Sequence, residues 1–464
     1  SADGLSVDGQ YSLPVYEPLS DGDLVKSLND NGVYKAAKIV GLKTAVTQSI
    51  TKAGDLVQVE ELNATTLLIL TTTKLYKADW NSSTGAITNL IEIAIPTVPT
   101  SITVLDSQTF VCGRLANQGS DNVNIYVTII TIISGTVTIG TEQTTTIWTT
   151  GTTSWREFSG LQLLALSSTG VIATCYCRNS YSSSNGRDLR AISFTVTGLF
   201  VTFGTPITLI TDSHGTYGSN SYRETIVLSS NSFAVLSGCD VKDSSYRPTP
   251  QDKTLHVRSI AAGVITGNSV TAQTYGDLNT TGSLALRYYD SVLYLFMTKG
   301  STTEARSATI AGTVPTLSTA VTLTTAIKIS YSLLVENSVY IVSGTSIYSF
   351  RVAAGQIKLT PDDSLVDSNL YKILKSTNQC YTFSNDNAIK TTRFLLDKDI
   401  LIGVADKSYT TDDDFVIQSI YKKVAGDLIP GVNYCVGADG QSLVAATTTK
   451  KVGRAISDTL IVKE

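Results

Sequence analysis

A short element recurs six times along this chain of 464 residues: a glycine that opens a turn, followed by β-branched or aromatic residues. The copies begin at Gly85, Gly135, Gly198, Gly263, Gly312 and Gly355. Glycine tolerates the positive φ of tight hairpin turns, and the residues after it favour a half-buried strand. Because the copies recur about every 40 to 65 residues among other short strands, the sequence predicts an all-β chain folded as a β-propeller.

A second repeated element, an apolar strand after a polar turn, precedes each of these glycines. Its copies are residues 66–70, 109–112, 171–174, 233–236, 292–296, 339–342 and 380–383. Several are almost continuously apolar, as expected for strands covered on both faces. The seventh copy has no glycine turn after it. We therefore expect residues 371–395 to supply the inner strands of the last blade and a strand near 36–60 to complete it, which gives seven blades, with six as the alternative.

The composition favours a scaffold. Only 16% of residues are charged, 42% are hydrophobic, and the net charge is −4. Such values argue against helical bundles, coiled coils and disordered tails, and they give no electrostatic reason to expect nucleic acid as a partner. No apolar run reaches 18 residues, so no membrane insertion is expected. We expect no cofactor.

The two ends of the chain differ from the repeats. Residues 397–464 contain alternating strands separated by Pro430-Gly431 and Asp439-Gly440 turns, and the N-terminal part reads as a hairpin with Asn31-Gly32 at its turn. Closing the ring brings both ends together. We therefore expect residues 1–35 and 397–464 to form one small β attachment module beside a propeller of residues 36–396.

The module segments resemble the terminal β module of many tailed-bacteriophage virion proteins. The resemblance lies in residues 401–405 (LIGVA), 428–436 (LIPGVNYCV), 439–443 (DGQSL), 452–462 (VGRAISDTLIV) and, near the start, 22–33 (GDLVKSLNDNGV). Two positions depart from the family pattern: Cys435 replaces an aromatic residue, and Ile429 stands where Thr is common. In that family the end pieces often bracket a low-charge propeller.

The resemblance implies a structural protein located in the virion, as a fibre, a spike or a capsid or neck decoration. It implies other virion proteins as partners and no catalytic set, so we expect no enzyme. Virion positions are symmetric, and we expect a homo-oligomer, with a trimer as the first hypothesis. Two alternatives stay open: a receptor-binding fibre whose propeller binds a bacterial surface glycan, and a polysaccharide-degrading spike.

Few residues in the sequence are candidates for catalysis or metal binding. The two histidines, His214 and His256, lie far apart in sequence without metal-ligand spacing, so we interpret them as structural or solvent-exposed. The acidic runs at 362–363 and 412–414 read as solvated turns. Residues 21–23 and 29–32 read as turns rich in Asp and Asn, with calcium as the weaker interpretation.

The aromatic and sulfur side chains give two further hypotheses. Trp80, Trp148 and Trp155 lie beside polar turns and are candidates for contact with a glycan, although Trp also caps blade edges or fills gaps between blades. Alignment of the repeats places Cys112 near Cys175, and Cys177 near Cys239. Disulfides between blades are therefore one hypothesis, and small buried thiols in tight packing are the other.

Overall fold

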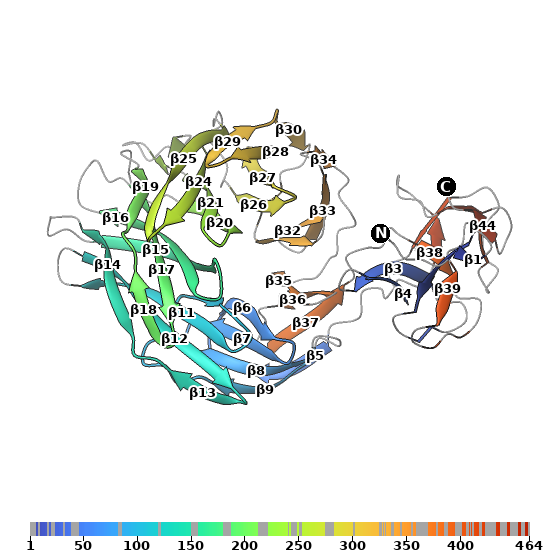
Figure 1. Cartoon of the computed structure of the whole chain (residues 1–464), viewed down its shortest axis with the longest axis horizontal. Coiled ribbons are helices and arrows are strands. Elements are labelled where there is room, and N and C mark those ends of the chain that lie inside the picture. Colours follow the sequence, from blue (N-terminus) through green and yellow to red (C-terminus); the bar gives the residue numbers. More distant parts are fainter. Residues whose placement is uncertain are drawn as a thin grey trace.

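The computed structural model of the chain shows the all-β architecture in Figure 1. It describes residues 46–81, 86–118, 122–149, 156–179, 187–211, 221–239, 253–273, 283–299 and 302–323 continuously and, elsewhere, the strands named below with a few single residues. In these described residues no helix could cross a membrane.

Between residues 46 and 394, the described strands form seven antiparallel sheets of four or five strands, which we number as blades 1 to 7, and one small two-stranded sheet. Blade 1 holds β6 (Leu56–Asn63), β7 (Thr66–Thr71), β8 (Leu75–Asn81) and β9 (Ala86–Glu92). Blade 2 holds β10 (Ser101–Val104), β11 (Thr109–Gln118), β12 (Asn122–Ile133), β13 (Thr136–Ile139) and β14 (Gln143–Thr149). Blade 3 holds β15 (Arg156–Ala165), β16 (Gly170–Asn179), β17 (Arg187–Thr197), β18 (Phe200–Phe203) and β19 (Ile207–Thr211). Blade 4 holds β20 (Ser221–Ser229), β21 (Ser232–Cys239), β24 (Lys253–Ala261) and β25 (Val264–Gln273), and the small pair β22 (Val241–Lys242) and β23 (Pro248–Thr249) lies between β21 and β24 in the chain.

The remaining three blades complete the ring. Blade 5 holds β26 (Leu284–Tyr289), β27 (Val292–Lys299), β28 (Thr302–Ala311), β29 (Val314–Leu317) and β30 (Val321–Leu323). Blade 6 holds β31 (Tyr331–Val335), β32 (Ser338–Ser343), β33 (Ser346–Ala353) and β34 (Gln356–Lys358). Blade 7 holds β35 (Leu370–Ser376), β36 (Gln379–Ser384), β37 (Ala388–Phe394) and β5 (Val46–Thr51). The first strand of each blade contacts the first strand of the next, and β35 contacts β6, so the ring is closed.

This topology confirms the predicted β-propeller architecture. The seven apolar runs predicted from the sequence all lie in the second strand of a sheet, from β7 to β36. Strand β5 pairs with β37, which confirms that an N-terminal strand completes the last blade. The blade number of seven stays a prediction from the repeats. The number of blade sheets in the described residues agrees with it.

The core consists of apolar clusters between successive blades, because each second strand is covered on both faces. In β16, Ala173 and Cys175 pack toward blade 2, whereas Ile172 and Tyr176 pack toward blade 4. Strands β7, β11, β21 and β27 alternate in the same way between clusters. The near-continuous apolar runs of the sequence therefore serve two interfaces each.

Polar side chains on the inner strands link each blade to the next. The amide of Gln58 on β6 accepts a hydrogen bond from the Ile102 N–H (3.0 Å) and donates one to the Ile102 carbonyl (2.8 Å). Equivalent bonds join the side chains of Ser101, Thr103, Gln162, Glu224 and Arg287 to the backbone of Leu163, Ala165, Thr225, Leu286 and Ser332. A buried backbone group needs a partner, so these bonds fix the register between neighbouring blades.

The predicted glycine turns join the third and fourth strands of the blades. Of the described ones, Gly135, Gly198, Gly263 and Gly312 have φ between 59° and 82°. Gly85 and Gly355 lie outside the described residues. The Gly263 turn also touches the preceding blade: its carbonyl accepts a hydrogen bond from the Thr205 N–H at 3.2 Å, and Gly204 lies so close that a Cβ there would meet that oxygen at 2.4 Å.

The two ends of the chain share sheets outside the ring. Strands β3 (Leu24–Asp30) and β4 (Val33–Lys38) form the predicted hairpin, and β3 also pairs with β38 (Leu401–Val404). Strand β2 (Gln10–Pro14) pairs with β1 (Ser6–Val7) and with β39 (Asp414–Val416). A further sheet holds β40 (Ile420–Lys422), β41 (Asn433–Val436), β42 (Leu443–Ala445), β43 (Gly453–Ala455) and β44 (Leu460–Val462).

We call these three sheets the end module; Figure 1 shows it beside the ring, with both chain ends in it. Its described core holds Leu13, Val15, Leu19, Val25 and Ala36. The domain boundaries at 35/36 and 396/397 stay predictions.

The two ends of the ring differ in the length of the connections between their strands. At one end of the ring, which we call the tight-turn end, the described strands are joined by turns of two to four residues, such as the Gly198 and Gly263 turns. The longer connections, among them residues 180–186, 212–220 and 359–369, all join strands at the opposite end. Because β37 ends and β5 begins at the tight-turn end, the chain leaves the ring for the end module there.

Candidate functional site

The structure corrects the hypothesis that Trp80 and Trp148 stack on a glycan. Trp80 is 4% exposed, and its ring lies 6.4 Å from that of Phe383, where blade 7 meets blade 1. Trp148 is 9% exposed within the apolar cluster between blades 2 and 3. Both rings fill gaps between blades, which was the competing interpretation. Trp155 lies outside the described residues.

The structure also contradicts the disulfide hypothesis for the described thiols. Cys112, Cys175 and Cys177 are free and buried. Cys112 and Cys175 occupy matching strands, β11 and β16, and each faces the preceding blade. The blade 2 sheet therefore stands between them. The side chain of Cys239 lies outside the described residues.

Cys175 and Cys177 face the same side of β16, as their spacing predicts, with 3.9 Å between their Sγ atoms. The contact with Cys175, together with burial, raises the pKa of the Cys177 thiol. Burial also raises the pKa of Cys112. These two thiols are thus protonated and act as small apolar groups.

His256 is a structural histidine. Its Nε2 lies 3.2 Å from Ser237 Oγ and its Nδ1 lies 2.7 Å from Ser269 Oγ, and the side chain is 1% exposed. Burial, with the nearby Arg258 guanidinium, lowers its pKa to about 3. A neutral, enclosed imidazole cannot reach a substrate, so this Ser–His contact belongs to the packing of blade 4. His214 lies outside the described residues.

The described acidic residues give no metal centre. Asp413 accepts hydrogen bonds from the Thr410 N–H at 2.6 Å and hydroxyl at 3.0 Å, as in the predicted turn. Among the described residues, no group of three His, Cys, Asp or Glu side chains could hold a metal ion. Residues 21–23 and 362–363 and the Asn31-Gly32 turn lie outside the described residues.

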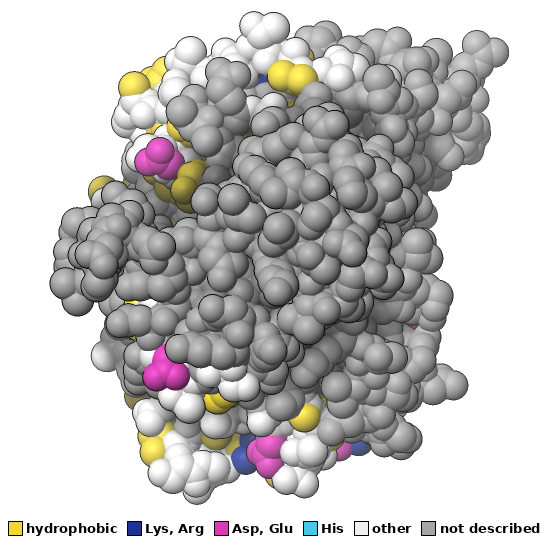
Figure 2. Space-filling view, turned by 90° about the vertical axis from the view of Figure 1, so that its right-hand side faces the viewer, with side chains coloured by type: hydrophobic (Ala, Val, Ile, Leu, Met, Phe, Trp, Pro, Cys, Tyr) yellow, Lys and Arg dark blue, Asp and Glu magenta, His cyan; other side chains and the backbone are white. Residues whose placement is uncertain are grey.

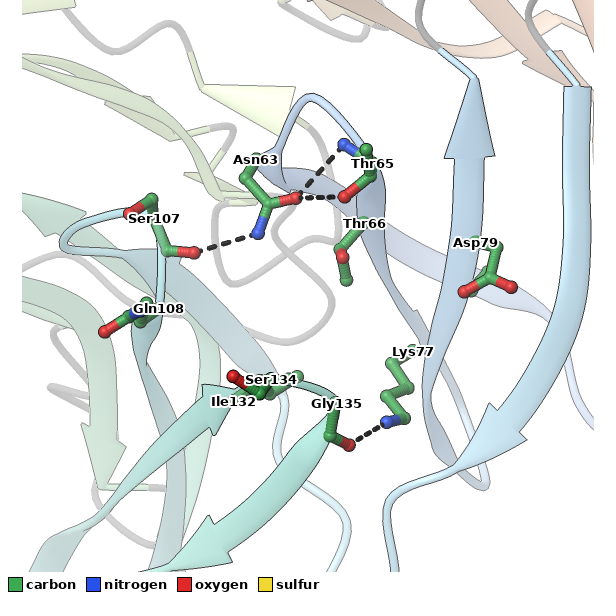
Figure 3. Close-up of a pocket in the computed structure, with 11 residues that line it drawn as sticks. Asn63, Thr65, Thr66, Lys77, Asp79, Ser107, Gln108, Ile132, Ser134 and Gly135 are labelled. Atoms are coloured by element: carbon green, nitrogen blue, oxygen red, sulfur yellow. Dashed lines mark hydrogen bonds between the residues drawn. The ribbon is translucent and has the colours of Figure 1, made fainter.

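A polar pocket of about 410 Å³ lies between blades 1 and 2, at the tight-turn end of the ring (Figure 3). We call it the blade 1/2 pocket. It is lined by Asn63, Thr65, Thr66, Lys77, Ala78, Asp79, Ser107, Gln108, Ile132, Ser134 and Gly135. These residues come from β8, from the ends of β6, β7 and β12, and from turns of both blades.

Hydrogen bonds hold the walls of this pocket in place. Asn63 Nδ2 donates to the Ser107 carbonyl at 2.9 Å, and Asn63 Oδ1 accepts from the N–H (3.1 Å) and hydroxyl (3.0 Å) of Thr65. On the other side, Lys77 Nζ donates to the Gly135 carbonyl at 2.5 Å. Each of these links except the Thr65 pair crosses from one blade to the other. The pocket is thus shaped by the contact between the blades.

Lys77 and Asp79 supply the charges of the pocket. They stand two residues apart on β8, so both point to the blade 2 side, while Tyr76 and Trp80 pack toward blade 7. Asn89 Nδ2 donates to Asp79 Oδ2 at 2.7 Å and orients that carboxylate. No sequence motif marks this pair, because the two charges become a pocket wall only when the next blade packs beside them.

Figure 2 shows the side of the molecule that carries the end module. In the described part of that surface, Asp and Glu side chains lie at separate places, and those at the lower edge of the view lie beside Lys or Arg atoms. The described atoms on this side form no single charged patch.

Comparisons with known proteins identify no family. No family model matches the chain, and no curated protein matches it. Three of the similar solved structures are a putative 6-phosphogluconolactonase from Bacteroides fragilis NCTC 9343, a functionally unknown protein from Desulfotomaculum acetoxidans DSM 771 and the polysaccharide lyase Uly1. Their identities are 13%, 12% and 9%, with TM-scores of 0.39, 0.38 and 0.39. They cover 80%, 79% and 83% of this chain and 100%, 99% and 100% of their own.

Proposed function

We propose that this chain is a structural protein of a tailed-phage virion, in which the end module attaches to the particle and the ring is displayed from it. One observation carries the proposal: β3 pairs with β38 and β2 pairs with β39, so both chain ends build the same small unit. The sequence motifs that resemble phage virion modules lie in these end segments.

The connection between the two parts suits this role. The chain enters and leaves the ring through neighbouring strands of blade 7, β5 and β37, at the tight-turn end. A ring held at one end presents its opposite end outward. Repeated particle positions are symmetric, so the module of one copy meets the modules of others, with a trimer as the first hypothesis.

The test is detection in particles. Particles purified from the phage or lysogen that encodes this chain are examined by mass spectrometry and by labelling with antibodies against the ring. We expect the chain in stoichiometric amount and the label on the particle exterior. Absence of the chain from washed, infectious particles would sink the proposal.

A second candidate function is receptor binding to a bacterial surface glycan by the displayed end of the ring. It is favoured by the position of the longer connections, which all join strands at the end opposite the module. In an adsorption assay, excess purified protein would compete with the phage for host cells. Unchanged adsorption at saturating protein would exclude this role while leaving the structural one intact.

A further inference from the structure

We infer that the blade 1/2 pocket binds a neutral saccharide unit. This goes beyond the structural role, and it concerns the tight-turn end of the ring, where the pocket residues Asn63, Ser107 and Gly135 lie.

The size suits a small ligand. Pockets that bind small molecules in proteins commonly have about 300 to 1,000 Å³. At about 410 Å³, the blade 1/2 pocket falls in the lower part of that range. One or a few sugar rings therefore fit this volume better than a folded partner does.

The charges favour a neutral ligand. The lining contains one cation, Lys77, and one anion, Asp79, on the same face of β8. An anion such as phosphate would meet the Asp79 carboxylate, and a polyamine would meet the Lys77 ammonium. A ligand whose hydroxyls both donate and accept hydrogen bonds satisfies both groups without a net charge.

The two charged groups of the pocket are already oriented by hydrogen bonds within the protein. Lys77 Nζ is tied to the Gly135 carbonyl, yet an ammonium has three donors. Asp79 is oriented by Asn89, yet a carboxylate has about four acceptor sites. Each group can therefore bind a hydroxyl without giving up the bond that fixes it, which lowers the ordering cost of binding.

The lining combines a polar wall with an apolar floor. Ile132 belongs to the apolar cluster between blades 1 and 2 and is 8% exposed. Thr66, Ser107, Gln108 and Ser134 add hydroxyl and amide groups around it. A pyranose has the same division, with C–H groups on its faces and hydroxyls on its edge. Among neutral polar ligands, this arrangement favours a sugar ring.

The test is direct binding to the whole purified chain. Saturation-transfer NMR and titration calorimetry would use D-glucose, D-galactose, N-acetyl-D-glucosamine and a neutral trisaccharide, with inorganic phosphate and spermidine as comparison ligands. We expect at least one neutral sugar to bind with a Kd of about 10 mM or below, which corresponds to a weak single-site contact. Tighter binding of the trisaccharide than of its monosaccharide would identify a chain of sugars as the natural ligand, and equal binding would identify a single unit.

Variants connect the binding to this pocket. Asp79→Asn and Lys77→Met should each weaken sugar binding at least tenfold, whereas Glu92→Gln, a change of an exposed acid outside the pocket, should not. Because Lys77 also links two blades, Ser107→Tyr serves as a second blocking variant at an exposed position. No sugar binding, tighter binding of phosphate or spermidine, or undiminished binding in Asp79→Asn and Ser107→Tyr would each overturn the inference.

Discussion

The carboxylate of Glu224 on β20 accepts a hydrogen bond from the backbone N–H of Leu286 on β26 at 2.7 Å and forms an ion pair with Arg287. Arg287 in turn donates to the carbonyl of Ser332 on β31. Two side chains therefore tie blades 4, 5 and 6 together along the inner strands.

Loss of Glu224 should weaken the ring. Its side chain is 19% exposed, so truncation leaves the Leu286 N–H and the Arg287 guanidinium with poor replacement partners. We expect Glu224→Ala to lower the free energy of unfolding by about 1.5–3 kcal/mol, and Glu224→Gln, which keeps an acceptor, by less. Chemical denaturation measures both. The control is Glu92→Gln, which removes an exposed ion pair with Lys74 and should change nothing measurable. A Glu224→Ala variant as stable as the parent would contradict this assignment.

The buried His256 predicts a pH dependence of stability. Its folded pKa of about 3 lies below the ordinary value of 6.5, so the unfolded chain binds this proton more readily. Neutral His256 contributes fully to the free energy of unfolding above pH 6.5. This contribution declines as the pH falls toward 3, by about 1.4 kcal/mol per pH unit. Urea denaturation gives the free energy of unfolding at each pH between pH 7 and pH 4. Plotted against pH, this free energy should change less steeply for His256→Gln than for the parent. Parallel curves for both proteins would show that His256 is not buried as a neutral ring.

Two glycines are expected to be required for different reasons: Gly204 because its neighbours leave no space for a side chain, and Gly198 because of its positive φ. A Cβ at Gly204 would meet the Gly263 carbonyl at 2.4 Å and Ser193 Oγ at 2.9 Å, so Gly204→Ala should cost about 1–3 kcal/mol. Gly198 has φ +59° and open space around a Cβ, and Asn tolerates that conformation. Gly198→Asn should therefore cost less than Gly204→Ala in thermal melts. The reverse order would disprove the close approach of the Gly263 turn to blade 3.

The described cysteines should behave as protected thiols. Cys112, Cys175 and Cys177 are free and buried, and we expect iodoacetamide to label them only after unfolding. Mass spectrometry of peptides from native and denatured protein measures this. A linked peptide joining Cys112 to Cys175 in the non-reduced digest would be inconsistent with the two separate clusters.

Local patterns were sufficient to predict the ring. The glycine turns and the apolar runs depend only on neighbouring residues, and so does the two-residue spacing that places Cys175 and Cys177 on one face. The unpaired seventh run was enough to predict the pairing of β5 with β37. Each of these inferences uses the period of a strand or the geometry of a turn.

The contacts between blades could not be predicted in this way. Cys112 and Cys175 align in the repeats, but equivalent positions of a ring are related by rotation and lie in successive interfaces, so alignment does not imply contact. Trp80 stands beside a polar turn in sequence, yet it shares its strand face with Tyr76 and packs against blade 7. The wall of the blade 1/2 pocket likewise combines β8 with turns of another blade, and only the packed ring brings them together.

The pairing of β5 with β37 also sets an order of events during synthesis. The ribosome delivers Val46–Thr51 early, but the partner strand Ala388–Phe394 emerges only after the rest of the ring. Until then, blade 7 has no fourth strand and β5 has no sheet. A product that stops before Ala388 therefore exposes β5 without its partner strand, and this edge can pair with another chain, whereas the finished chain pairs β5 with its own β37.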